Sequence, residues 1–200
     1  RLGVRLPPPI DDLAAAGGLV ILVHLLYGFN PDSSYLSPAP LYHSAPLRFN
    51  MAIQRIGGTC IIMENYDPEQ ALQLIEKYEV TCSQWVPTMF VRMLKTPEAI
   101  RTKYDLSTHK MAIHAAAPCP IPVKKQMIEW WGPIISEYYA GTEGNGFCTI
   151  NSQEWISHEG AVGKAIMGEL HIVGEDGEEA TTGEPGSIFV ANGSAFEYYN

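Results

Sequence analysis

Short apolar runs alternate with amphipathic segments through the middle of the chain. The runs at residues 59–63, 80–86, 110–114 and 134–139 have the length and composition of buried strands. Between them, segments that open at Asp67, Pro87 and Pro122 carry apolar residues at helical spacing. Asp67 is followed by Pro68 and by Gln70, which is typical of a helix N-terminus. The alternation predicts an α/β fold: a layered, mostly parallel sheet with flanking helices.

The same spacing predicts which helical residues face the core. They are Ala71, Leu72, Ile75 and Tyr78, then Phe90, Val91 and Leu94, then Val123, Met127, Trp130 and Trp131. Upstream we expect an extended proline-rich linker to about residue 9, a helix over 11–27 and a short strand around residues 35–36.

The pattern changes after about residue 150. Residues 169–174 and 187–191 resemble strands, and an acidic, glycine-rich stretch joins them. We therefore predict an antiparallel pair in a smaller β-rich subdomain. The expected division is an α/β part at 1–150 and the start of the β-rich subdomain at 151–200.

Composition and charge exclude several classes of protein. Hydrophobic residues make up 46% of the chain and charged residues 18%, which excludes a disordered chain. The formal net charge of -9 argues against nucleic-acid binding. The apolar stretch at 19–26 is too short to cross a bilayer. No CxxC motif is present, so we expect the four cysteines to be small buried residues in a reducing compartment.

The run EYYAGTEGNG, residues 137–146, follows a predicted strand. Ligands of open α/β sheets bind just beyond the carboxyl ends of strands. Tyr139 offers a flat ring for a base, Thr142 a hydroxyl and Glu143 an oxygen ligand for Mg²⁺. Backbone can approach a ligand closely at Gly141, Gly144 and Gly146. The order is not GxGxxG, so hydride chemistry is not supported. These residues fit a nucleotide site and, equally, a flexible turn with an incidental carboxylate.

A second run, HAAAPCP at residues 114–120, also follows a predicted strand. The small side chains of Ala115, Ala116 and Ala117 leave room beside a planar ligand, and Pro118 stiffens the loop. A tightly packed strand-to-helix turn explains the same residues equally well.

A third run, PLYHSAP at residues 40–46, places His43 beside Ser44. Sequence neighbours rarely form a nucleophile–base pair, and the chain has no GxSxG elbow, so a hydrolase is disfavoured. We expect His43 to line a substrate cavity instead. The histidines that lack ligand spacing, expected to serve packing or to lie on the surface, are His24, His109, His158 and His171.

Five segments, in order, resemble motifs of acyl-CoA synthetases of the adenylate-forming (AMP-binding) superfamily. LYHSAP at 41–46 resembles their aromatic-or-His substrate motif, and AAAPCP at 115–120 resembles their GAAPL-type adenine loop. YAGTE at 139–143 matches YGxTE, with Ala140 in place of the glycine. GAVGKAIMGE at 160–169 resembles GSVGRPxPGxE, and GEPGSIFV at 183–190 resembles GExGEIxV.

The resemblance implies a fold and a set of roles. The fold is the family's large N-terminal domain, with α/β layers and a β-rich subdomain. Tyr139 stacks on adenine, Thr142 contacts phosphate and Glu143 holds Mg²⁺, which makes the last two the catalytic residues. His43 and Gly144 lie near the acyl substrate. The remaining nucleotide-binding positions are Ala115, Ala116, Ala117, Pro118, Ala140 and Gly141.

The implied activity is ATP-dependent activation of a hydrophobic carboxylic acid, with a medium- or long-chain fatty acid as the first choice. The acyl group then passes to coenzyme A, so the cofactors are ATP, Mg²⁺ and coenzyme A and the partners are small molecules. Alternatives are a bulkier sterol-type or aromatic acid, or a non-catalytic nucleotide-binding remnant. We expect a cytoplasmic protein, with peripheral contact to a membrane left open.

The 200 residues lack the family's phosphate loop, its ribose motif and its late lysine. We therefore expect an internal piece of a longer protein that does not turn over alone.

Overall fold

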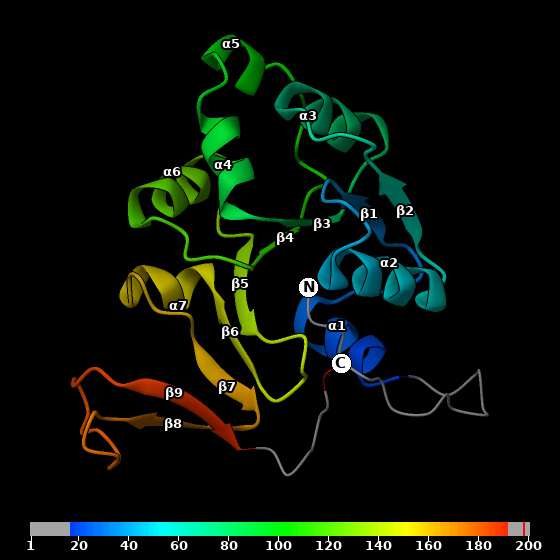
Figure 1. Ribbon diagram of the computed structural model, residues 1–200. Helices are drawn as coiled ribbons and strands as arrows, with labels where there is room; N and C mark the ends of the chain where they lie inside the picture. Colours follow the sequence, from blue (N-terminus) through cyan, green and yellow to red (C-terminus); the bar gives the residue numbers. More distant parts are fainter. Residues whose placement is uncertain (1–16, 192–197, 199–200) are drawn as a thin grey trace.

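The computed structural model describes residues 17–191 and 198, and seven of its strands form one mixed sheet (Figure 1). Their order across the sheet is β2-β1-β3-β4-β5-β6-β7. Neighbours from β2 to β5 pair in parallel, whereas β6 and β7 are antiparallel. The mostly parallel sheet predicted from the sequence is confirmed. The strands are β1 (Ser34–Ser37), β2 (Thr59–Ile62), β3 (Cys82–Trp85), β4 (Met111–His114), β5 (Ile135–Ala140), β6 (Phe147–Asn151) and β7 (Lys164–Met167).

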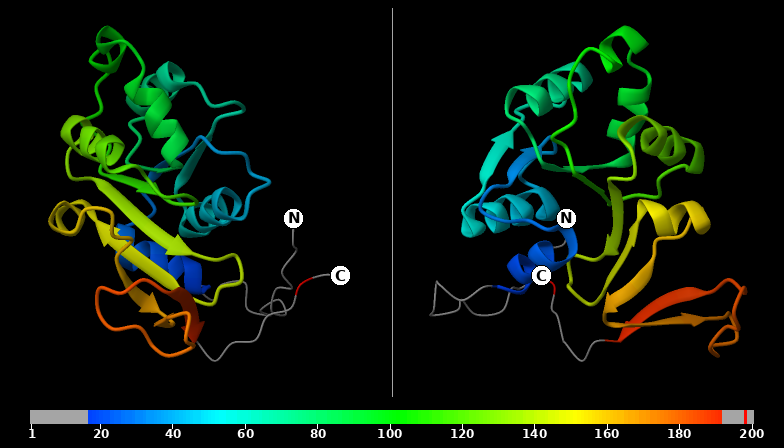
Figure 2. Two further views of the ribbon diagram at one scale, coloured as in Figure 1. Left: turned by 60° about the vertical axis from the view of Figure 1, so that its left-hand side comes forward. Right: turned by 180° about the vertical axis from the view of Figure 1, so that it is seen from behind.

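Helices cover both faces of this sheet (Figure 2). On one face, α1 (Gly18–Tyr27) and α2 (Ser44–Ile56) pack aromatic and aliphatic side chains against β1, β3 and β5. On the other face lie α3 (Pro68–Lys77), α4 (Pro87–Leu94) and α6 (Ile121–Trp131). Two short helices, α5 (Glu98–Arg101) and α7 (Ser152–Ser157), complete the layer. The flanking helices are therefore confirmed as well.

Helix α3 begins where its sequence predicts. The Asp67 side chain accepts a hydrogen bond of 2.9 Å from the backbone N–H of Gln70, and Pro68 is the first helical residue. Tyr78 is the C-cap residue of this helix and is 45% exposed. The prediction that Tyr78 faces the core is therefore wrong.

Other differences concern the inward face of α4 and elements for which no prediction was made. The unpredicted elements are α2, α5, α7, β6 and β7. In α4 the core is filled by Met89, Phe90 and Met93, while Val91 and Leu94, which we predicted to face inward, are half-buried. Residues 1–16, which include the predicted linker and the start of the predicted first helix, lie outside the described residues.

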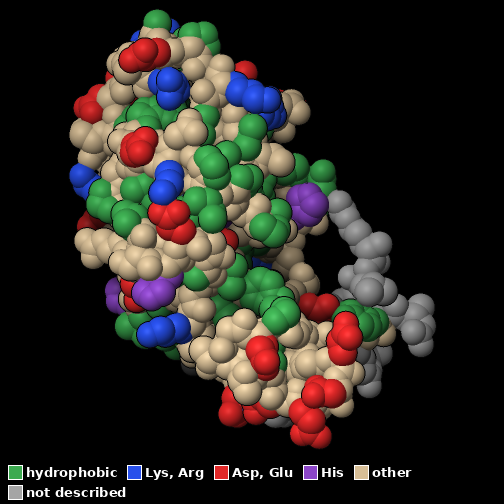
Figure 3. Space-filling model, turned by 90° about the vertical axis from the view of Figure 1, so that its left-hand side faces the viewer, with side chains coloured by type: hydrophobic (Ala, Val, Ile, Leu, Met, Phe, Trp, Pro, Cys, Tyr) green, Lys and Arg blue, Asp and Glu red, His purple; other side chains and the backbone are tan. Residues whose placement is uncertain are grey.

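A separate two-stranded sheet follows the large one. Strands β8 (Glu169–Val173) and β9 (Ser187–Ala191) pair antiparallel, as predicted. The large sheet itself continues to β7, and the boundary at 150/151 stays a prediction. Acidic side chains gather over this hairpin (Figure 3): Glu169, Glu175, Asp176, Glu178, Glu179 and Glu184.

All four cysteines are free thiols; Cys82 and Cys148 are buried, and Cys60 and Cys119 are half-buried. Within residues 17–191, no helix combines the length and apolar character needed to cross a bilayer.

Candidate functional site

The two loops singled out in the sequence leave the same edge of the sheet. Strands β4 and β5 are parallel neighbours, and His114 pairs in register with Glu137. The loop at 115–120 follows the carboxyl end of β4, and the loop at 141–146 follows that of β5. This edge is where open α/β sheets bind their ligands. The parallel pairing of β4 and β5 therefore places the two runs side by side, although helix α6 separates them in the sequence.

Consecutive tyrosines on β5 face opposite sides of the sheet. Successive side chains of a strand point to opposite faces, and β5 keeps its register with β6 as far as Ala140. Tyr138 is buried on the α1–α2 face, where its ring stacks on Phe49 at 6.0 Å and on Phe147 at 5.0 Å. Tyr139 is 45% exposed, so its ring is free to take a planar partner.

The 115–120 loop combines one buried alanine with an exposed tip. Ala115 is buried, whereas Ala116, Ala117 and Pro118 are exposed. Ala116 has a φ of 77°, in the left-handed region that residues with a Cβ rarely adopt. This loop therefore holds a strained backbone beside the Tyr139 loop.

A cavity of about 390 Å³ opens on the α1–α2 side of the second loop. Four predicted site residues line it: Ala140, Gly141, Thr142 and Gly144. Its apolar wall consists of Leu19, Leu22, Phe49, Tyr138, Phe147 and Met167, and Ser44, Ala45 and Arg48 of α2 complete it. An apolar cavity with a few polar groups is the usual form of a small-molecule site.

His43 lies beside this cavity rather than in its wall. It is the N-cap residue of α2, is exposed, and has its ring 4.6 Å from that of Tyr42. Ser44 and Ala45 line the cavity in its place. The role of His43 toward a substrate stays a prediction.

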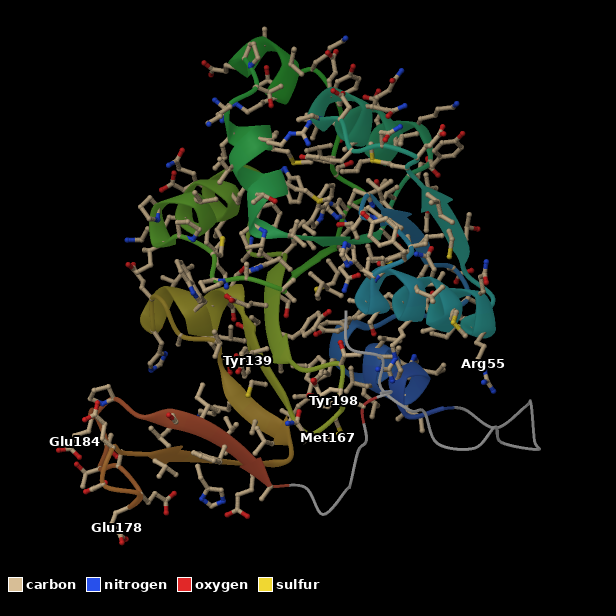
Figure 4. The ribbon with its side chains drawn as sticks, viewed as in Figure 1. Arg55, Tyr139, Met167, Glu178, Glu184 and Tyr198 are labelled. Carbon is tan, nitrogen blue, oxygen red and sulfur yellow. The ribbon has the colours of Figure 1, made fainter. Side chains whose placement is uncertain are left out.

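The Glu143 carboxylate is held by polar contacts from its own loop and from the end of the chain. The hydroxyl of Tyr198 donates a hydrogen bond of 2.8 Å to Glu143 Oε1. Figure 4 places Tyr198 and Met167 beside the loop between β5 and β6. The backbone N–H of Glu143 and the Tyr198 hydroxyl together lower the pKa of Glu143. This side chain is therefore a carboxylate at neutral pH.

The carboxylate of Glu143 could hold Mg²⁺ only together with ligands from another molecule. Among residues 17–191 and 198, no group of three or more His, Cys, Asp or Glu side chains could enclose a metal ion. Mg²⁺ in nucleotide sites is usually held by one or two carboxylates together with substrate phosphates. Glu143 therefore fits as the protein's contribution to a Mg²⁺–nucleotide complex.

Sequence reasoning missed a buried charged pair beneath the two loops. Lys124 is fully buried on α6, and its Nζ lies 2.5 Å from Oε2 of Glu137 on β5. Lys124 also lies over the Trp155 ring, at 4.7 Å. The spacing of Lys124 from Met127 put it on the buried face of the helix, which is the signal that was available.

The aromatic wall of the cavity was missed too, although α2 has a readable pattern. Four of its five buried residues, Pro46, Phe49, Asn50 and Ile53, recur at helical spacing. The motif at 40–46 predicts a role for His43, whereas it is the helix after His43 that lines the cavity.

Comparisons with known proteins agree with one another. "4-coumarate--CoA ligase-like 8" of Arabidopsis thaliana is 31% identical over 148 residues, which are 72% of this chain and 27% of that protein. "4-coumarate--CoA ligase-like 3" from the same plant is 28% identical over 84% of this chain and 31% of that protein. "Medium/long-chain-fatty-acid--CoA ligase FadD8" of Mycobacterium tuberculosis is 25% identical over 78% of this chain and 28% of that protein. The chain thus spans about a third or less of the length of these curated relatives.

Solved structures share the fold. ATP-bound MatB from Rhodopseudomonas palustris has a TM-score of 0.74 at 24% identity, over 90% of this chain and 36% of that chain. O-succinylbenzoate coenzyme A synthetase (MenE) from Bacillus subtilis, in complex with AMP, has a TM-score of 0.70 at 22% identity, over 91% of this chain and 37% of that one.

The match to a family is broader than any single relative. A sequence model of the family described as "AMP-binding enzyme" matches residues 13–200. This chain therefore belongs to the AMP-binding enzyme family.

Proposed function

We propose that the complete protein is an ATP-dependent ligase that joins a hydrophobic carboxylic acid to coenzyme A. A carboxylate oxygen of the acid attacks the α-phosphate of ATP, and the bond from that phosphorus to the pyrophosphate oxygen breaks. The thiolate of coenzyme A then attacks the acyl carbon, and AMP leaves. Family membership and the names of the CoA-ligase relatives support this proposal.

The observation that carries the proposal is that the end of β5 and the loop after it present residues to both faces of the sheet. Tyr139 presents an exposed ring on one face of the sheet, and the next residues line an apolar cavity on the other. A nucleotide on the first side and an acid on the second would meet at Gly141 and Thr142. Positioning of two reactants in this way supplies a large part of many enzymes' rate enhancement.

The residue roles follow from chemistry and location. Tyr139 stacks on adenine, Ala115 to Pro118 flank it, and the Thr142 hydroxyl donates to a phosphate oxygen. Glu143 would hold Mg²⁺, which when bound offsets the charge of the phosphates. Gly144 lies where the acyl carboxylate enters, with His43 nearby.

The preferred substrate is a medium- or long-chain fatty acid, because the cavity wall is mainly apolar. An aromatic acid is the second candidate, and two observations favour it. The wall carries the stacked rings of Phe49, Tyr138 and Phe147. Two of the relatives are named as 4-coumarate–CoA ligase-like proteins.

We also make proposals about the location of the protein, its domain division and the activity of these 200 residues alone. We infer a cytoplasmic, reducing location from the four free thiols. We keep the division at 150/151 as the start of a β-rich subdomain. We also propose that residues 1–200 alone do not turn over, because they span only about a third of their relatives.

Acid-dependent exchange of pyrophosphate into ATP tests the function. The complete protein is assayed with dodecanoic, hexadecanoic, 4-coumaric and cholic acids, and thioester formation is followed after adding coenzyme A. We expect the fatty acids to stimulate exchange most. Preference for 4-coumarate would select the aromatic alternative and preference for cholate the sterol-type one. ATP binding without exchange for any acid would favour the non-catalytic remnant.

A further inference from the structure

A buried polar cluster lies at the base of both loops. His114 and Lys124 are fully buried and Glu137 is 5% exposed. One carboxylate oxygen contacts both neighbours: Glu137 Oε2 is 2.5 Å from Lys124 Nζ and 3.4 Å from His114 Nε2.

These residues stand at the two ends of the 115–120 loop. His114 is the last residue of β4, immediately before Ala115. Lys124 is in the first turn of α6, which begins at Ile121. Glu137 belongs to β5, two residues before Tyr139. A single oxygen on the strand that carries the second loop therefore contacts residues at both ends of the first.

The two contacts differ in kind. Burial and the nearby Lys124 charge lower the pKa of His114 to about 3, so its ring is neutral at pH 7. The His114–Glu137 contact is therefore packing, and the ring is further held edge-on by Phe90 at 5.5 Å. The Lys124–Glu137 contact is a hydrogen bond between two charged groups. Both side chains are buried, so water is excluded from this contact.

The loop between these ends is strained. Ala116 has a φ of 77°, a conformation that costs a residue with a Cβ free energy and that glycine adopts readily. Such strain persists only where the surrounding structure over-determines the backbone. Near Ala116 the loop tip is exposed, so the constraint has to come from the ends of the loop.

We propose that Glu137, with Lys124 and His114, forms a clamp that holds the 115–120 loop in its strained form. These are positioning residues: they touch no substrate and act through Ala115 to Pro118. The inference rests on the proposed function, because it is the adenine side of the site that the clamp sets. It goes beyond that function by assigning a role to buried charges that the reaction itself does not use.

The alternative is that the pair merely stabilises the fold. Removing one partner of a buried pair leaves an unpaired charge and destabilises any protein, whatever its role. Replacing both partners by apolar residues is often tolerated. The double variant Lys124→Met/Glu137→Leu is therefore the one to test, with Lys124→Met/Glu137→Gln, which also leaves no unpaired charge, as a second variant.

Adding Ala116→Gly separates the two explanations. If the clamp holds a strained Ala116, loss of the clamp lets the loop relax to another conformation. Glycine at position 116 then makes the wild-type loop conformation accessible again. If the pair only stabilises the fold, Ala116→Gly restores nothing. The matched control is Lys125→Met/Glu159→Gln. It removes a half-exposed ion pair, with Lys125 Nζ 2.6 Å from Glu159 Oε1, and Lys125 is the residue after Lys124 on α6.

Two readouts are measured on the complete protein: hydrogen exchange of the amides of residues 115–117 and 119, and the KM for ATP in pyrophosphate exchange. We expect the double variant to speed amide exchange and to raise KM by about tenfold each, the scale on which small displacements of positioned groups act. Ala116→Gly in that background should return both most of the way, and the control pair should move neither. Lys124→Met/Glu137→Gln should give the same changes.

Wild-type values for both readouts in the clamp variants, or no recovery with Ala116→Gly, would overturn the clamp. Hydrogen exchange needs no turnover, so it judges the clamp even if the wild-type protein shows no pyrophosphate exchange. The absence of pyrophosphate exchange in the wild-type protein would overturn the proposed function instead.

Discussion

The hydroxyl of Tyr198 donates a 2.8 Å hydrogen bond to Oε1 of Glu143, across 55 positions of the chain. The carboxylate that we assign to the Mg²⁺–nucleotide complex is thus held by a residue from beyond β9. Its other oxygen, Oε2, would lie only 2.5 Å from a Cβ placed on Gly141. The Glu143 carboxylate is therefore held by a hydroxyl on one side and lies close to the Gly141 backbone on the other.

Tyr198→Phe removes only the hydroxyl and should loosen Glu143. The bond to Tyr198 lowers the pKa of Glu143, so its loss moves that pKa upward and the acid limb of the activity profile to higher pH. We expect the KM for Mg²⁺ to rise about two- to fivefold, the size of one exposed polar contact. Tyr78→Phe, at another half-exposed tyrosine, is the control. An unchanged Mg²⁺ dependence would remove Tyr198 from the site.

Gly141→Ala should displace the Glu143 carboxylate at little cost in stability. The new Cβ would meet Oε2 of Glu143, which is the end of a flexible side chain and can move away. We expect adenylation to fall at least tenfold or so, as for other misplaced catalytic groups, with a melting temperature close to wild type. Gly144→Ala makes the opposite comparison, since Gly144 has open space but a φ of 70°. It should lower stability more than Gly141→Ala does.

Tyr139 supplies a ring, and its hydroxyl is dispensable in our account. Tyr139→Phe should bind ATP like wild type, whereas Tyr139→Ala should weaken binding by about 1–3 kcal/mol, the usual value of base–aromatic stacking. Calorimetry with a non-hydrolysable ATP analogue measures both. Equal affinities of the Phe and Ala variants would exclude stacking.

His109 should make stability depend on pH. Its ring is buried, lies 2.6 Å from the Ser83 hydroxyl, and burial lowers its pKa to about 3. The folded protein therefore keeps His109 neutral while the unfolded chain takes up a proton below about pH 6.5. Its contribution is complete above pH 6.5 and is lost as the pH falls toward 3, by up to about 1.4 kcal/mol per pH unit.

His109→Gln should accordingly be less stable at pH 7 and lose less on acidification than wild type. Urea unfolding at pH 7 and pH 4.5 gives both numbers. His158→Gln, at an exposed histidine, should follow the wild-type slope. A wild-type slope in His109→Gln would mean that other groups carry the acid sensitivity.

The sequence predicted the strands and helices whose signals are local. Residues 59–63 and 110–114 are apolar enough to be recognised alone, and Asp67–Pro68 marks a helix start by its own hydrogen bond. Strands β6 and β7 have no such signal. They are defined by pairing with β5 and with each other, which depends on residues distant in sequence.

The candidate site was predictable as two loops but not as an arrangement. That Tyr138 and Tyr139 face opposite sides follows from strand alternation once β5 is placed. The spacing of Lys124 from Met127 indicates its burial, but its partner Glu137 could not be predicted until β5 and α6 are packed together. The contact of Tyr198 with Glu143 joins segments with no pattern in common.

The central claim is that Glu143 belongs to an adenylate-forming centre. The most direct measurement compares wild type with Glu143→Ala and Glu143→Gln in fatty-acid-dependent exchange of pyrophosphate into ATP, alongside their melting temperatures. Our account predicts acid-dependent exchange in the wild type and a loss of about a hundredfold or more in both variants, comparable to removal of other electrostatic groups that act in a transition state, with little change in melting temperature. Exchange at the wild-type rate in Glu143→Ala would contradict it.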